Sequence, residues 1–142
     1  MADEVGDPRL IAVSIARVGL GESYAGQLTP GLLEHGVDLE VDHGLALEYD
    51  DSPRYALARV RMQLGQLEES RRLLQDLDAE ASARGDESTR VRLLWAQSML
   101  EWLSGDWSRA RELTDAAHDL SKETEHAHGL NWIGRATRCT RS

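Results

Sequence analysis

The chain has 142 residues, of which 41% are apolar, and carries a formal net charge of −9 with one cysteine. This size and composition fit a single globular domain with a real hydrophobic core. There is no apolar run long enough to cross a bilayer, and the acidic start MADEVGDPRL is unlike a signal peptide, so we expect a cytoplasmic protein. Cys139 has no second cysteine to pair with, which agrees with a reducing compartment.

The negative charge is concentrated in the first third of the chain. Residues 1–50 carry ten acids and two bases, whereas residues 51–142 carry fifteen acids and fourteen bases. Neither part has the dense positive face that binding to phosphates requires. Arg135, Arg138 and Arg141 recur every three residues, but three charges fit a solvated helix face. We therefore expect no direct nucleic-acid binding and no membrane contact.

Three prolines indicate where helices begin, because each follows a residue that can cap a helix: Asp7-Pro8, Thr29-Pro30 and Ser52-Pro53. Glycines after apolar runs indicate where helices end, namely Gly19 and Gly21, Gly65, Gly85 and Gly105. The segment at 9–18 contains β-branched residues that suit a strand, but the Asp7-Pro8 cap favours a helix. These signals predict an all-α chain of about seven helices, at 8–19, 30–48 with a weak point near His43-Gly44, 53–64, 67–84, 87–104, 107–124 and 127–139.

The segments GQLEESRRLL at 65–74 and GDWSRARELT at 105–114 follow one pattern forty residues apart. The equivalent positions are Gly65 and Gly105, Leu67 and Trp107, Ser70 and Ala110, Arg71 and Arg111, Leu73 and Leu113, and Leu77 and Ala117. A glycine that ends one helix, a capping residue and a small residue in the next helix together predict an antiparallel helix pair. Such pairs cannot bury their apolar faces alone, so we expect them to stack as a solenoid. The predicted units of this single domain (1–142) are 8–49, 53–85, 87–125 and a partial unit at 127–142.

The turn segments LGQLEES and SGDWSRA resemble the turn and second-helix start of tetratricopeptide repeats (TPR), although the forty-residue period exceeds the usual ~34 residues. Longer helices of this kind resemble the helical-repeat region of large ATP-dependent LuxR-type (MalT-like) transcriptional regulators. The segments that carry the resemblance are GDPRL at 6–10, SPRYALARVRMQLGQLEESRRLL at 52–74, ARGDEST at 83–89 and SGDWSRARELTDAAHDLSKETE at 104–125. In those regulators the repeats lie between a nucleotide-binding module and a helix-turn-helix, and neither is encoded here.

The last predicted helix, at 127–139, lacks the partner that would complete a further repeat. Its apolar residues Leu130, Trp132 and Ile133 would then be uncovered. We expect either a fragment of a longer regulator or a homodimer that buries this C-terminal helix.

Motifs for catalysis, cofactors or metals are incomplete. The glycines of GESYAGQL at 21–28 are spaced as in a P-loop, but the lysine and hydroxyl that hold phosphate and magnesium are missing. His126 and His128 lie near Glu123 and Glu125 without the spacing of a metal motif, and are interpreted as polar loop histidines. We therefore expect no enzyme activity, no cofactor and no metal.

The helix predicted at 87–104 has a broad apolar stripe that includes Trp95, Met99 and Trp102. Such a stripe usually belongs to a core, and lining a ligand or peptide groove is the alternative. The first helices of the pairs would form a concave binding face. We expect six residues of that face to be exposed and to bind a partner: Tyr55, Arg59, Met62, Arg92, Gln97 and Glu101.

These observations predict a non-enzymatic module that acts by protein contact or effector sensing. By resemblance, it would pass the bound state to other modules of a LuxR-type regulator. A stand-alone TPR-like scaffold or dimerisation protein is the alternative from the same sequence.

Overall fold

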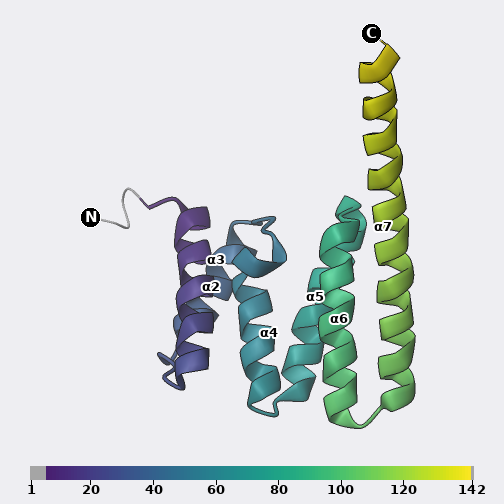
Figure 1. Ribbon diagram of the computed structural model, residues 1–142. Helices are drawn as coiled ribbons and strands as arrows, with labels where there is room; N and C mark the ends of the chain where they lie inside the picture. Colours follow the sequence, from purple (N-terminus) through teal and green to yellow (C-terminus); the bar gives the residue numbers. More distant parts are fainter. Residues whose placement is uncertain (1–5, 142) are drawn as a thin grey trace. The chain divides into compact units, whose positions relative to one another are not determined.

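The structure is a computed structural model that describes the backbone of residues 6–141 and the side chains of residues 6–125. Over these residues it contains six α-helices, one short 3-10 helix and no β-strand (Figure 1). In chain order the elements are α2 (Pro8–Ala25), α3 (Leu32–Asp42), η1 (Tyr49–Asp51), α4 (Pro53–Gln63), α5 (Leu67–Arg84), α6 (Glu87–Ser104) and α7 (Trp107–Arg141). The predicted helices at 53–64, 67–84 and 87–104 are confirmed to within one residue.

The chain forms two compact units, Met1–Glu80 and Ala81–Ser142. In the first unit, α2, α3 and α4 pack against one another. Their core contains Ile15 and Ala16 from α2, Leu33 from α3, and Leu57 and Val60 from α4. The helix predicted at 8–19 is therefore confirmed as a helix, and of its β-branched residues Ile15 lies in the core with Ile11 packed against it, whereas Val18 is exposed.

The first helix does not end at Gly19 or Gly21, as predicted, but continues to Ala25 and ends at Gly26. Gly19 does not end the helix but allows α3 to pack closely against α2. A Cβ atom at this position would lie 2.4 Å from the Leu33 side chain of α3, so the missing side chain lets the two helices approach. The P-loop-like segment 21–28 is thus largely the last turn of α2 and its cap.

The second helix also differs from its predicted range of 30–48. Thr29 does not cap it, because Gly31 is the N-cap residue. The Thr29 backbone N–H and hydroxyl instead donate to the Glu22 carboxylate of α2, at 2.8 and 2.7 Å. The helix begins at Leu32 and ends at Asp42, with His43 as its C-cap. Residues 43–48 follow without helical structure and lead into η1.

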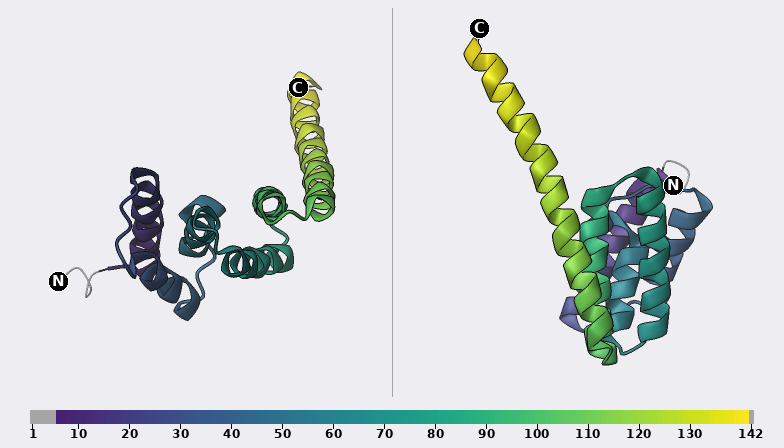
Figure 2. Two further views of the ribbon diagram at one scale, coloured as in Figure 1. Left: turned by 90° about the horizontal axis from the view of Figure 1, so that it is seen from below. Right: turned by 90° about the vertical axis from the view of Figure 1, so that its right-hand side faces the viewer.

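The helices predicted at 107–124 and 127–139 are one continuous helix, α7, so residues 6–141 contain fewer helices than predicted. Figure 2 shows α7 continuing well past the end of the neighbouring α6. The hydroxyl of Thr124 donates to the Leu120 carbonyl at 2.9 Å within the helix, and it does not cap a new one. The proposed junction at His126–His128 contains no proline or terminating glycine pair that would break the helix.

The two turns of the forty-residue repeat have equivalent hydrogen bonds. Gly65 and Gly105 both adopt the left-handed conformation, with φ of 79° and 91°. The N–H of Gln66 donates to the Arg61 carbonyl at 2.8 Å, and at the equivalent positions Asp106 donates to Glu101 at 3.0 Å. A side chain at the left-handed position would be strained, which explains why glycine recurs there.

The contact between the two helices of each pair also repeats. Ser70 donates to the Ala58 carbonyl at 2.8 Å, and Ser98 donates to the Ala110 carbonyl at 3.0 Å. A shift of forty residues places Ala58 on Ser98 and Ser70 on Ala110, so the serine and the alanine exchange helices while the close contact is kept. The predicted small residue at the helix crossing therefore has the expected role in both pairs.

Candidate interaction site

An apolar groove of about 520 Å³ lies between α6 and α7 in the second unit. The two helices run side by side and are joined by the Gly105 turn (Figures 1 and 2). Asp86 caps α6 by accepting from the Thr89 N–H at 3.2 Å, and Asp106 caps the start of α7 by accepting from the Arg109 N–H at 3.1 Å. These two caps set where α6 and α7 begin.

The groove is floored by small side chains and walled by large ones. Ser98, Ala110 and Thr114 form the floor, where the Ser98 and Thr114 hydroxyls lie 2.6 Å apart. The walls come from both helices: Trp95, Met99 and Trp102 on α6, and Trp107 and Arg111 on α7. The small residues bring the helix backbones together and leave a hollow between the large side chains.

The wall residues are exposed, contrary to the expectation that the tryptophan stripe belongs to the core. Trp95, Met99, Trp102 and Trp107 have 44%, 49%, 56% and 67% of their surface exposed. The rings of Trp102 and Trp107 lie 5.7 Å apart at an interplanar angle of 58°. The buried face of α6 is a different stripe, which includes Leu93, Leu94 and Leu100. The stripe of Trp95, Met99 and Trp102 thus lines a groove, which was the alternative to a core position.

The α7 wall is not visible in the sequence pattern, where Trp107 is only the position equivalent to Leu67 in the other repeat. One signal could have revealed the groove: α6 has two apolar stripes, Trp95–Met99–Trp102 and Leu93–Leu100, on different faces of the helix, which is more apolar surface than one core-facing stripe. The leucine stripe is buried, so the aromatic stripe is left exposed.

The six predicted partner-binding residues are not uniformly exposed. Tyr55, Met62 and Glu101 are buried, which corrects their assignment to an open face, whereas Arg92 is exposed and Arg59 and Gln97 are half-buried. Tyr55 and Arg59 interact with each other, because the Arg59 guanidinium donates to the Tyr55 hydroxyl at 3.2 Å. Tyr55 also packs edge-on against Tyr49, with ring centroids 5.4 Å apart. The burial of Tyr55, Met62 and Glu101 depends on tertiary contacts, which the sequence pattern alone does not show.

The predicted exposed end or dimer contact lies in the last part of α7 and consists of Leu130, Trp132 and Ile133. The structure describes the backbone of these residues but not their side chains. The same applies to His126, His128 and the three C-terminal arginines. None of these predictions is tested by the structure.

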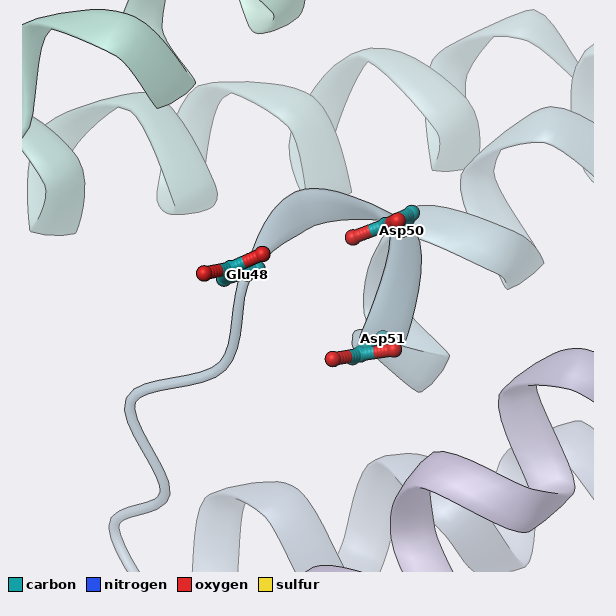
Figure 3. A group of neighbouring side chains, drawn as sticks. All are labelled: Glu48, Asp50 and Asp51. Atoms are coloured by element: carbon teal, nitrogen blue, oxygen red, sulfur yellow. The ribbon is translucent and has the colours of Figure 1, made fainter.

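Within the described part of the chain, one group of acidic side chains has the proximity of metal ligands. Oxygen atoms of Glu48, Asp50 and Asp51 lie within 4.8 Å of one another around η1 (Figure 3). Asp51 is already engaged, because its carboxylate accepts from the Arg17 guanidinium at 3.0 Å. Glu48 and Asp50 are exposed to solvent, where acidic side chains are commonly found without an ion.

A second, smaller hollow of about 190 Å³ lies in the first unit. It is bounded by apolar residues of α2, α3 and α4, including Leu33, Leu57 and Val60, and by Glu34. Glu34 is paired with Arg61 at 3.0 Å. Glu22 also lines this hollow, where it accepts hydrogen bonds from Thr29. The hollow in the first unit is therefore lined by two carboxylates and one paired cation, whereas the larger groove presents a cation, Arg111, on its wall.

Comparisons with protein-family models, with curated proteins and with solved structures found no match for the chain. Over the residues that the structure describes, no helix is long and apolar enough to cross a membrane.

Proposed function

We propose that the chain is a non-enzymatic, helical-repeat interaction module whose α6–α7 groove binds a protein. One observation carries this proposal: four large apolar side chains, three of them tryptophan, are exposed together around a single hollow. Contiguous exposed apolar patches are rare in monomeric proteins and mark interaction surfaces. Tryptophan is also among the residues that contribute most to binding energy at protein interfaces.

A protein partner fits the groove better than a small effector. Pockets for small molecules enclose most of the ligand surface. Here the α6 wall residues are about half exposed, and Trp107 more so, so the groove is open along one side. An open groove between two helices suits a third helix, whose apolar residues at three-and-four spacing would fill it.

The proposal extends to the arrangement of the repeats. Equivalent turns at Gly65 and Gly105 and equivalent Ser–Ala helix contacts support a TPR-like solenoid of stacked pairs. The resemblance to the helical-repeat region of LuxR-type regulators supports a role in coupling a binding event to other modules. A stand-alone scaffold would use the same groove.

The experiment is site-specific photo-crosslinking in the cells that produce the protein. A photoreactive phenylalanine derivative replaces Met99 in the groove wall, and in the control it replaces Tyr24, an exposed aromatic residue of α2. We expect discrete crosslinked protein adducts at position 99 and none of comparable yield at position 24. Equal yields at both positions, or no adduct at position 99, would contradict the proposal.

A further inference from the structure

We propose that the groove is covered by α6 and α7 of a second copy of the chain, whose apolar wall side chains pack into it, which gives a two-fold dimer. This inference rests on the proposed function, because it names the partner of that groove. Three observations support a second copy of the chain as the occupant: a self-complementary pair of charges, the distribution of net charge and the amount of apolar surface.

The first observation is the charge pattern at the edge of the groove. Arg111 lines the groove, and Asp115 lies one helical turn further along α7, in a shallow hollow that shares Trp107 and Arg111 with the groove. Both side chains are exposed, and neither forms an ion pair with any residue in the described part of the chain. A cation and an anion one turn apart are self-complementary under a two-fold axis. Arg111 of one copy then meets Asp115 of the other, and the reverse contact forms by symmetry.

The second observation is the distribution of net charge. Residues 1–80 carry sixteen acids and seven bases, whereas residues 81–142 carry nine acids and nine bases. Two copies that met through the acidic first unit would repel each other. Contact through the neutral second unit avoids most of that repulsion, and the groove lies wholly within this unit.

The third observation is the amount of apolar surface. Fully buried aromatic side chains remove about 150–250 Å² each from water. With the wall residues and the neighbouring Leu103 each about half exposed or more, one copy offers on the order of 500 Å² of apolar surface. Two copies would bury roughly 1,000 Å² from these side chains alone, which reaches the size of a specific interface before polar contacts are counted.

The test is sedimentation of the purified full chain over a range of concentrations, with charge-exchange variants. We expect a dimer that dissociates on dilution. Arg111→Asp and Asp115→Arg should each weaken dimerisation roughly tenfold or more, because each places like charges opposite one another. The double variant R111D/D115R exchanges the two charges and should restore dimerisation to near the original level. Rescue by the double variant distinguishes a direct contact from a general effect of charge.

Two further variants test the apolar part. Trp102→Ala should weaken the dimer, and Tyr24→Ala, which removes an exposed aromatic residue outside the groove, should leave it unchanged. Circular dichroism of every variant shows whether the helices are retained.

The inference is overturned by a monomer at all concentrations, or by a dimer that none of the groove variants affects. A monomer that nevertheless forms groove-specific crosslinks to a different protein in cells would overturn only this inference and leave the proposed function standing. A monomer without such crosslinks would overturn both.

Discussion

At the scale of single residues, the most constrained charge is Glu40, which is 1% exposed. From α3 its carboxylate reaches the beginning of α4, where it accepts from the Ser52 hydroxyl at 2.6 Å and from the Arg54 N–H at 2.9 Å. The Arg54 Nε atom lies 3.2 Å from the same carboxylate, and the guanidinium also pairs with Glu80 of α5. Burial lowers the pKa of Arg54, but the hydrogen bond to Glu80 and the charge of Glu40 outweigh it, so the pKa is raised.

Replacing Glu40 by Gln should destabilise the protein by about 2–4 kcal/mol, because the amide keeps the shape but leaves Arg54 without its buried countercharge. Urea unfolding followed by circular dichroism measures the change in the free energy of unfolding. Asp38→Asn is the matched control, since Asp38 is exposed on the same helix and should change stability by less than about 0.5 kcal/mol. Equal effects of the two variants would show that the Glu40 network is not stabilising.

Asp86, the cap of α6, links stability to pH. The pKa of its carboxyl is lowered, chiefly because the Thr89 hydroxyl donates to the carboxylate at 2.7 Å, with smaller contributions from the Thr89 N–H and from Arg84. Because the folded pKa lies below the unfolded value of about 3.9, the stabilisation is present above that value. It is lost as the pH falls through the folded pKa.

Asp86→Asn keeps a capping side chain but removes the charge. We expect the variant to be less stable than the original protein near pH 7, and the difference to shrink as the pH falls towards 3. Urea unfolding of both proteins at the two pH values measures this. A stability difference that does not depend on pH would contradict the assignment.

At the scale of elements, two glycines in helices have opposite roles. Gly36 of α3 lies at a close approach, where a Cβ atom would be 2.7 Å from the Ile15 side chain and 2.9 Å from the Pro53 ring. Gly21 of α2 has no atom within 4 Å of such a Cβ position. The same substitution should therefore give opposite results at the two sites.

Gly36→Ala should destabilise the protein by about 1–3 kcal/mol, because overpacking against a rigid proline ring outweighs the gain in helix propensity. Gly21→Ala should stabilise it by about 0.5–1 kcal/mol, because only the propensity term remains. Thermal and urea unfolding of both variants measure these changes. Stabilisation by Gly36→Ala would show that α2, α3 and α4 pack less tightly than the structure indicates.

At the scale of the whole molecule, the aromatic residues are divided between the two units. All four tryptophans lie in the unit that begins at Ala81, and the three whose side chains are described are on the groove wall. Tryptophan fluorescence is therefore a specific probe of the second unit. The groove tryptophans become less accessible to solvent if a second copy covers them.

Quenching of this fluorescence by acrylamide should be weak at high protein concentration and increase on dilution, as the dimer separates. The Arg111→Asp variant should be strongly quenched at every concentration, because its groove stays uncovered. Stern–Volmer constants measured across a dilution series provide the comparison. Quenching that is independent of concentration in both proteins would contradict burial of the groove by a second copy.

Several features follow from local chemistry alone. Ser52 with Pro53, Asp86 before Glu87, and the glycines at 65 and 105 predict the bounds of α4, α5 and α6 to within one residue. The forty-residue repeat is equally visible, because equivalent turns need glycine at the same left-handed position. Capping and turn geometry depend on residues a few positions apart, so a sequence determines them directly.

Other features depend on contacts between distant residues, and only the tertiary structure decided them. In the sequence Gly19 resembles a helix stop, but in the structure it is the point where Leu33 packs closely against α2. Thr29 resembles a helix cap, but it is bonded to Glu22 of α2, and the next helix begins after Gly31. In the same way, the composition of α6 specifies two apolar stripes but not which one is buried. In the structure Leu93, Leu94 and Leu100 are buried, and Leu94 packs against Leu113 and Ala117 of α7, whereas Trp95, Met99 and Trp102 stay exposed around the groove. Which stripe is buried depends on where the neighbouring helices lie, and this is not encoded within α6.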